Sequence, residues 1–405
     1  MTIREIADAW QGRPTFAVID LDALATNYQA LRAFVGPDVK IMSVVKANGY
    51  GHGAIPVSET VLANGADFVA VATVDEGAQL RKAGINADIL VLGPMGAAEK
   101  DRAVGMGMSI VMSDVPFAKG LARTVRMHQR KEPIKVHLKI DTGMRRFGVA
   151  PGEVVRAAQI ITSFPELKLE GLMTHFASAD EPDTTSVHEQ VRIFDQCVAD
   201  LAAAGIEIPI HHVCNSAATL QFPEYHKNMV RPGIAGYGIK PAPHIDLPGE
   251  PGRMKQVVSI HSRVSRVIPL AKGDSVSYGG TWTADRPTRA ALVPIGYADG
   301  YLRSLSNRSW MAISGERADV IGRVCMDQTL LHLPEGLPAG TRQPITVVGN
   351  GTDEMPHAPM LEDLAEVSGS IPHEFITTMA PRLPRLYVRH GKLVAVADLE
   401  GYRKI

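Results

Sequence analysis

Five polar residues stand at the ends of five apolar segments of the chain. Lys46 ends the run "IMSVVK", and later runs end at or near Lys139, His175, Asn215 and Arg231. A strand also ends wherever polarity begins, so any one of these residues alone carries little weight. Side chains at the carboxyl ends of barrel strands face the active site, however, so the five residues together predict a functional site.

The chemistry that Lys46 predicts is attack on a carbonyl group. A lysine that is partly desolvated at such a mouth has a lowered pKa, and its neutral amine becomes a nucleophile toward an aldehyde. Pyridoxal 5′-phosphate is the aldehyde cofactor that enzymes hold on a lysine. Its phosphate requires backbone N–H groups and hydroxyls, which Ser216, Gly233 and Ile234 offer in predicted turns.

Short β-branched runs alternate with longer segments of helical period between about residues 14 and 245. Most of the runs are apolar throughout, as in strands that are covered on both faces. The eight strand candidates are residues 41–48, 68–73, 89–93, 109–113, 134–142, 169–176, 211–215 and 229–238. We therefore expect an α/β fold with a (β/α)8 barrel of the TIM type. An open doubly wound sheet fits less well, because no GxGxxG follows the first run.

After about residue 250 the pattern changes to runs that alternate apolar and polar residues. One such run, residues 256–282, contains Lys-Gly-Asp at 272–274, which is a turn signal. The sequence thus predicts a barrel domain at residues 14–245 and a mostly β C-terminal domain at residues 250–395. Residues 1–13 can pack with the C-terminal domain.

The composition is that of an ordinary globular protein. Among 405 residues, 45% are hydrophobic and 21% are charged, and the formal net charge is −1. No basic block indicates nucleic acid, no apolar run reaches the ~18 residues of a membrane span, and the N-terminal segment has no apolar signal core. Three scattered cysteines, Cys197, Cys214 and Cys325, predict neither disulfides nor a metal site. We expect a cytoplasmic protein without nucleic-acid or membrane partners.

The segment "VVKANGYGHG" resembles the cofactor-lysine signature of the alanine racemases. Further blocks resemble that family in the same order along about residues 14–390: "LKIDTGMRRFGV", "THFASAD", "HVCNSAATLQFP", "MVRPGIAGYG", "SYGGTW", "GYADGY" and "GRVCMDQ". The resemblance implies the same barrel and β domain. It also implies a pyridoxal-phosphate-dependent isomerase that interconverts L-alanine and D-alanine, either to supply D-alanine for cell-wall peptidoglycan or to catabolise it.

Two catalytic bases follow from this resemblance. Lys46 matches the lysine that holds the cofactor and serves as one base, and Tyr278 matches the tyrosine that serves as the opposite base. Racemisation requires both, because a proton leaves Cα on one face and another returns on the other face. In the family this tyrosine comes from the second subunit of a head-to-tail dimer, so a homodimer with shared sites is implied.

The other site residues are also implied by the resemblance. Arg231 matches the arginine that donates to the pyridine nitrogen, and its permanent charge makes the ring a weaker electron sink. Arg146 and the backbone N–H of Met326 match the groups that meet the substrate carboxylate. The remaining cofactor contacts and supporting residues are Tyr50, His175, Asn215, Ser216, Gly233, Ile234, His373, Lys139, His212 and Asp327.

Two positions leave alternatives open. Lys139 matches a lysine that is often carbamylated in the family, but it can equally be a buried cation paired with Asp141 or Asp180. His373 departs from the tyrosine that usually lines the substrate entrance and donates to the phosphate. Histidine can still donate, but the entrance changes shape. A broader serine and alanine racemase is therefore an alternative, and a pyridoxal-phosphate-binding protein without turnover is a further one.

Overall fold

The computed structural model describes residues 5–6, 10–250, 252–337, 340–352 and 355–405. The chain divides into two compact units. The barrel unit comprises residues 25–49 and 54–254. The β unit comprises the chain up to Leu24, the segment Tyr50–Gly53 and Lys255–Ile405.

The barrel unit is built on eight strands that pair in parallel, in the order β8-β7-β6-β5-β4-β3-β2-β9. A backbone bond from the Arg231 N–H to the Cys214 carbonyl (3.0 Å) joins the segments that follow the two end strands. The bounds are β2 Lys40–Val44, β3 Phe68–Val71, β4 Asp88–Val91, β5 Ser109–Met112, β6 Ile134–Lys139, β7 Leu167–Met173, β8 Ile210–His212 and β9 Met229–Val230. The predicted TIM-type barrel is confirmed.

Amphipathic helices connect the barrel strands. In α9 the buried residues Val187, Val191, Phe194 and Leu201 recur at the spacing of one helix face, so this face packs inward. Between residues 10 and 250 the helices are α2 Leu21–Val35, α3 Lys46–Tyr50, α4 Ala54–Ala63, α5 Val74–Lys82, α6 Ala97–Gly105, α7 Val115–Met127, α8 Val154–Thr162, α9 Thr185–Ala203 and α10 Ser216–Gln221, with short 3-10 turns η1 Pro151–Glu153, η2 Pro223–Tyr225 and η3 Ile234–Tyr237. Among the described residues, no helix combines the length and apolar character that a membrane span requires.

The β unit is dominated by an eleven-stranded sheet in the order β11-β14-β17-β16-β15-β18-β10-β1-β19-β20-β21, with β12 and β13 as a separate pair. Its strands are β1 Phe16–Asp20, β10 Val258–Arg263, β11 Arg266–Leu270, β12 Ser275–Val276, β13 Trp282–Thr283, β14 Thr288–Val293, β15 Trp310–Ile313, β16 Glu316–Ile321, β17 Thr329–His332, β18 Pro344–Val348, β19 Arg385–Arg389, β20 Lys392–Asp398 and β21 Gly401–Lys404. Its helical segments are η4 Tyr278–Gly280, η5 Tyr297–Asp299, η6 Arg303–Leu305, α11 Leu361–Ser368 and α12 Pro372–Thr377. The predicted mostly β character of this part is confirmed.

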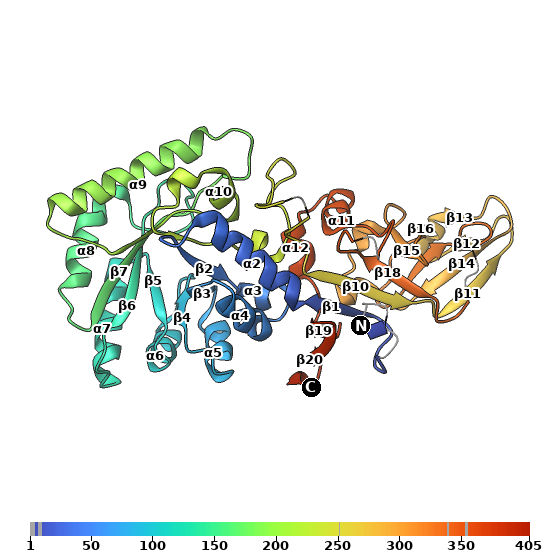
Figure 1. Cartoon of the computed structure of the whole chain (residues 1–405), viewed down its shortest axis with the longest axis horizontal. Helices are drawn as coiled ribbons and strands as arrows, with labels where there is room; N and C mark the ends of the chain where they lie inside the picture. Colours follow the sequence, from blue (N-terminus) through green and yellow to red (C-terminus); the bar gives the residue numbers. More distant parts are fainter. Residues whose placement is uncertain (1–4, 7–9, 251, 338–339, 353–354) are drawn as a thin grey trace. The chain divides into compact units, whose positions relative to one another are not determined.

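The first strand of the chain belongs to the sheet of the β unit. β1 pairs antiparallel with β10 and in parallel with β19 (Figure 1). The side chains of Phe16 and Val18 join Leu386 and Val396 in one apolar cluster, which explains the pairing. The domain boundaries at residues 14–245 and 250–395 stay a prediction, although β1 lies on the β side of the division.

Candidate active site

Lys46 stands two residues after the end of β2, at the start of a turn with left-handed backbone. α3 is not a regular helix, because Ala47, Asn48 and Gly49 have φ angles of 51°, 54° and 62°. Tyr50 continues this conformation with φ 50°. Each non-glycine residue in it costs roughly 1–2 kcal/mol, so contacts from elsewhere must hold the turn.

Glu76 of α5 anchors this left-handed turn. Its carboxylate accepts from the N–H of Ala47 (2.7 Å) and from the N–H of Ala72 (2.7 Å), and it also closes the capping box of α5. Burial and then the positive charge of Arg146 lower the pKa of Lys46, whereas Glu76 opposes this effect. The Lys46 amine therefore becomes neutral more readily than the amine of an exposed lysine, which suits a nucleophile or a base.

Arg231 is buried just after β9, where backbone carbonyls fix its guanidinium. Its NH groups donate to the carbonyl oxygens of His212 (2.7 Å), Thr174 (2.8 Å) and Val213 (3.1 Å). They also face Nδ1 of His212 at 3.1 Å and Nδ1 of His175 at 3.3 Å. Because a guanidinium can only donate, both ring nitrogens accept. Burial lowers the pKa of Arg231 to about 10, so it remains a cation near neutral pH.

Positive charges gather around His175 at the end of the barrel strands. Burial and then the charges of Arg231, Arg146, Lys139 and Lys46 lower the pKa of His175 well below its usual value. The four cations, named here the cation cluster, therefore share one region although they come from different segments. Like charges repel strongly where water is excluded, so the cluster favours an anionic ligand.

Lys139 ends β6 and is only 3% exposed. Its Nζ lies over the ring of Phe147, 3.3 Å from the ring centroid. Burial and then the charges of Arg146 and Arg231 lower the pKa of Lys139 to about 8, while Asp141 opposes them. Lys139 therefore rests on an aromatic face, a contact that the sequence does not predict.

A polar turn joins the segments that follow β8 and β9. Asn215 caps α10 with its side chain, and Ser216 is the first residue of that helix. The hydroxyl of Ser216 accepts from the N–H of Gly233 (2.8 Å) and the N–H of Ala235 (3.3 Å). Ile234 then begins η3. Three of the predicted phosphate contacts, Ser216, Gly233 and Ile234, thus lie together, and such a turn of hydroxyl and N–H groups suits a phosphate.

In the β unit, Tyr50 lies near His373 of α12, with ring centroids 6.1 Å apart. Tyr50 is only 8% exposed, and burial raises its pKa to about 12, so its hydroxyl remains a donor. Arg385 fixes the segment after Tyr50, because its Nε donates to the Gly51 carbonyl at 2.6 Å. The structure thus pairs the predicted phosphate tyrosine with the residue that departs from the family.

Tyr278 and Met326 lie on exposed loops of the β unit, where they are 73% and 51% exposed. Ser277 precedes Tyr278 with φ 61°, and its hydroxyl donates to the Arg323 carbonyl at 2.6 Å. The N–H of Ala298 donates to the Met326 carbonyl at 3.0 Å. Loops that are held by hydrogen bonds and present exposed tyrosine and methionine side chains are typical of surfaces that contact another chain.

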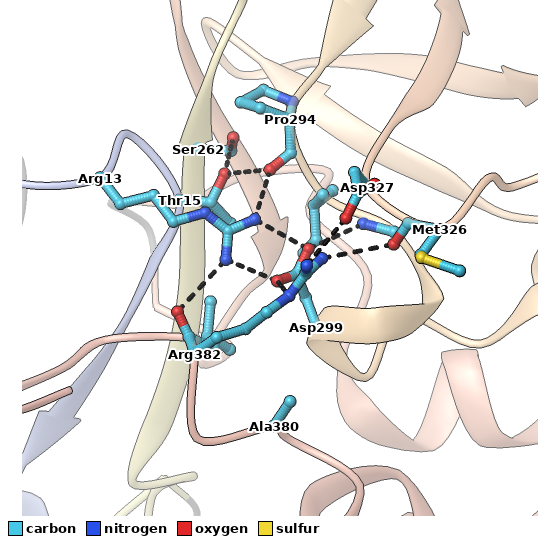
Figure 2. Close-up of polar contacts among 12 residues, drawn as sticks. Arg13, Thr15, Ser262, Pro294, Asp299, Met326, Asp327, Ala380 and Arg382 are labelled. Carbon is cyan, nitrogen blue, oxygen red and sulfur yellow. Dashed lines mark hydrogen bonds and ion pairs between the residues drawn. The ribbon is translucent and has the colours of Figure 1, made fainter. Parts of the chain in front are cut away.

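Asp327 belongs to a charged network, shown in Figure 2. Arg382 lies 2.8 Å from Asp327 and donates to Asp299 at 2.8 Å. Arg13 donates to both oxygens of Asp299, at 2.5 and 2.9 Å. Burial alone would raise the pKa of Asp299, but Arg13, Arg382 and the Gly296 N–H lower it below its usual value. The fully buried Asp299 side chain is therefore ionised.

This network also fixes the loop that carries Met326. Arg382 donates to the Met326 carbonyl at 3.4 Å, and Figure 2 shows this carbonyl beside the guanidinium. A Cβ on Gly296 would lie 2.4 Å from the same oxygen, so the two loops approach this closely only because residue 296 is glycine.

The predicted residues thus fall into two groups. The barrel unit holds Lys46, Lys139, Arg146, His175, His212, Asn215, Ser216, Arg231, Gly233 and Ile234, and the β unit holds Tyr50, Tyr278, Met326, Asp327 and His373. Sequence reasoning missed Glu76 and Asp299. The Thr-x-x-Glu pattern of a capping box could have identified Glu76. No local pattern around Asp299 predicts its ion pairs with Arg13 and Arg382, which lie far away in the sequence.

Comparison with known proteins gives one consistent result. Two family models, the N-terminal and C-terminal domains of alanine racemase, match residues 19–241 and 257–387. An alanine racemase from Geobacillus stearothermophilus is 40% identical over 96% of this chain and 97% of its own length. One from Symbiobacterium thermophilum is 39% identical over 93% of this chain and 97% of its own. The crystal structure of the Bacillus anthracis enzyme with bound L-Ala-P has a TM-score of 0.87 at 36% identity, covering 96% of this chain and 98% of that one.

The charged network predicts a large loss of stability on removal of its central carboxylate. Asp299→Asn should lower the free energy of unfolding by about 3–5 kcal/mol, because two guanidiniums are left without their buried partner. Urea unfolding at neutral pH measures the change. Since the folded-state pKa of Asp299 is lowered, its stabilising effect is present at neutral pH, and the difference from wild type should shrink below about pH 4.

Asp319→Asn is the matched control, since Asp319 pairs with Arg317 at 2.9 Å on the exposed face of the same unit. It should change stability little. Equal effects of the two substitutions would contradict the special role of Asp299.

Proposed function

The chain belongs to the alanine racemase family, and from this premise we propose that it is a pyridoxal-phosphate-dependent isomerase that interconverts L-alanine and D-alanine. The observation that carries the proposal is the placement of Lys46, with its lowered pKa, within the cation cluster around His175. A cluster of this kind suits two anionic groups, the cofactor phosphate and the substrate carboxylate.

The residues of the barrel unit fit the cofactor. When bound, pyridoxal phosphate draws electrons from the substrate Cα and acidifies the Cα–H bond. The Ser216 hydroxyl and the N–H groups of Gly233 and Ile234 would hold the phosphate. Arg231, oriented by three carbonyls, donates to the ring nitrogen and leaves it unprotonated, because the guanidinium keeps its own proton. Lys46 is the point of covalent attachment.

Lys46 and Tyr278 move the protons in this proposal. In one direction Lys46 accepts the proton from Cα and Tyr278 returns one to the opposite face, and in the other direction their roles are exchanged. The lowered pKa of Lys46 favours the neutral amine that can accept. Arg146 and the Met326 N–H bind the substrate carboxylate and so hold the Cα–H bond between the two bases.

We propose that two chains form a homodimer and share their sites. Support comes from Tyr278 and Met326, which are exposed on loops held by hydrogen bonds. In a single chain, the proposed catalytic base and carboxylate-binding group would face water. The proposal includes a cytoplasmic location, which fits three cysteines that are all free thiols. The comparisons do not favour a broader racemase or a binding protein without turnover, because alanine racemases match nearly the whole chain.

Purified protein incubated with L-alanine should produce D-alanine until the two are nearly equal, as measured by chiral chromatography. Lys46→Ala should abolish the reaction, whereas Lys82→Ala, which removes an exposed lysine of α5, should not. Borohydride should fix the cofactor to the peptide that contains Lys46. Label on another peptide, or cofactor-loaded protein that leaves L-alanine unchanged, would contradict the proposal.

Shared sites predict complementation between two inactive chains. In a dimer of Lys46→Ala and Tyr278→Phe chains, one site has both bases and the other has neither. Mixing the variants should therefore restore activity to at most about a quarter of wild type as chains exchange. Chain exchange is followed independently with fluorescent labels. Exchange without recovery would show that each barrel uses its own tyrosine.

His373→Tyr should change substrate preference more than alanine turnover. A phenol is longer than an imidazole, and His373 lies beside Tyr50, so the larger ring narrows the space there. We expect kcat/KM for L-alanine to change less than about tenfold, and kcat/KM for L-serine to fall further. His390→Tyr, at a side chain that is 84% exposed, is the control. An unchanged serine-to-alanine ratio would place the selectivity elsewhere.

A further inference from the structure

A line of buried polar side chains runs from Arg231 into the interior of the barrel unit. Nδ1 of His212 lies 3.1 Å from an NH group of Arg231. Nε2 of His212 lies 2.8 Å from Nδ1 of His137. Nε2 of His137 lies 3.7 Å from a carboxylate oxygen of Glu170. His212 and His137 are 0% exposed and Glu170 is 6% exposed, and the proposed function uses neither His137 nor Glu170.

Each residue in this line donates a hydrogen toward the next one, from Arg231 to Glu170. Arg231 can only donate, so Nδ1 of His212 accepts and the hydrogen of the neutral ring lies on Nε2. That hydrogen is donated to Nδ1 of His137, so the hydrogen of His137 lies on its own Nε2 and faces Glu170. Burial lowers the pKa of both histidines, and the positive Arg231 lowers that of His212 further, so both rings are neutral. The carboxylate end is charged: burial would raise the pKa of Glu170, but His137 and Lys135 lower it to about 2.

The backbone is shaped to admit the His137 ring. A Cβ on Gly171 of β7 would lie 2.1 Å from Nδ1 of His137, so only glycine leaves room for the ring. The pairing of β6 with β7 also shifts register between Val136 and His137. The ring meets His212 edge-on, at 4.9 Å between centroids and 80° between planes. A glycine and a register shift thus occur together where the His137 ring lies. Both features of the backbone make room for the ring in this position.

We propose that His137 is a positioning residue for Arg231: by accepting from Nε2 of His212, it fixes the tautomer whose Nδ1 accepts from the guanidinium. The inference rests on the proposed function, in which Arg231 meets the cofactor ring. Arg231 favours this tautomer as well, but without an acceptor at residue 137 the Nε2 hydrogen of His212 is left buried and unpaired, and this cost allows the tautomer with the hydrogen on Nδ1 to compete. Two donors would then face each other at the 3.1 Å contact, and the guanidinium would turn away from its present plane.

Three substitutions separate this role from simple packing. His137→Leu removes the acceptor. His137→Asn keeps one, since its side-chain oxygen can take the place of Nδ1. Gly171→Ala leaves every polar group but pushes the His137 ring away. His226→Leu is the control, because His226 is a buried histidine of the same unit whose Nε2 contacts the Thr219 carbonyl at 2.7 Å, and this bond involves neither Arg231 nor His212.

The primary readout is the tautomer of His212, measured in the full chain by NMR of 15N-labelled histidine rings. Wild type, His137→Asn and His226→Leu should carry the His212 hydrogen on Nε2, whereas His137→Leu and Gly171→Ala should shift it toward Nδ1. In the same proteins kcat for alanine should fall about 10-fold to 100-fold in His137→Leu and Gly171→Ala, and by less in His137→Asn.

An unchanged His212 tautomer in folded Gly171→Ala or His137→Leu protein would overturn the inference, as would equal losses of kcat in His137→Leu and His137→Asn. If His137→Leu does not fold, Gly171→Ala and His137→Asn decide the question. The tautomer measurement does not depend on turnover. A wild-type protein without racemase activity would therefore refute the proposed function alone, and the NMR result would still test the inference.

Discussion

Charge of one sign, concentrated where the barrel strands end, is the constraint on which the rest of the site depends. Lys46, Lys139, Arg146 and Arg231 each lower the pKa of His175, so each acts in the same desolvated region. The protein offsets the repulsion locally: carbonyl oxygens surround Arg231, and Phe147 lies under Lys139. Glu76 and Asp141 offset part of the charge of Lys46 and Lys139, but the cations outnumber these two carboxylates, so the region favours an anionic ligand.

The site also includes a strained backbone segment, the left-handed turn after Lys46, which needs contacts from other segments to be stable. The left-handed turn after Lys46 is anchored by Glu76, which also caps α5, so the helix and the turn are fixed by one carboxylate. In the β unit a single buried carboxylate, Asp299, similarly joins Arg13 and Arg382 and fixes the Met326 loop. Each anchor is a charge-assisted bond to a group far away in the sequence, which makes the site rigid.

Local patterns were sufficient to predict the barrel, because its strands are continuous apolar runs and all its pairs except β2 with β9 join strands that are consecutive in the sequence. All eight candidates contain or overlap an observed strand, from β2 to β9. The place of β1 could not be predicted, since its partners β10 and β19 lie far along the chain. The contact of His137 with His212 is equally hidden, because a register shift and Gly171 create it, and neither leaves a periodic signal. The roles of the site residues came from family resemblance, and they remain proposals.

The position of β1 between β10 and β19 has a consequence for synthesis on the ribosome. Phe16–Asp20 leaves the exit tunnel early, but Val258–Arg263 and Arg385–Arg389 follow only after the whole barrel sequence. At roughly 5–20 residues per second, this apolar strand waits on the order of tens of seconds with both edges unpaired. The strands from β2 to β8 follow one another closely along the chain, although β2 must wait for β9, whereas the eleven-stranded sheet closes only when translation is nearly finished. Unpaired strand edges favour aggregation, so β1 carries this risk until β10 and β19 have emerged.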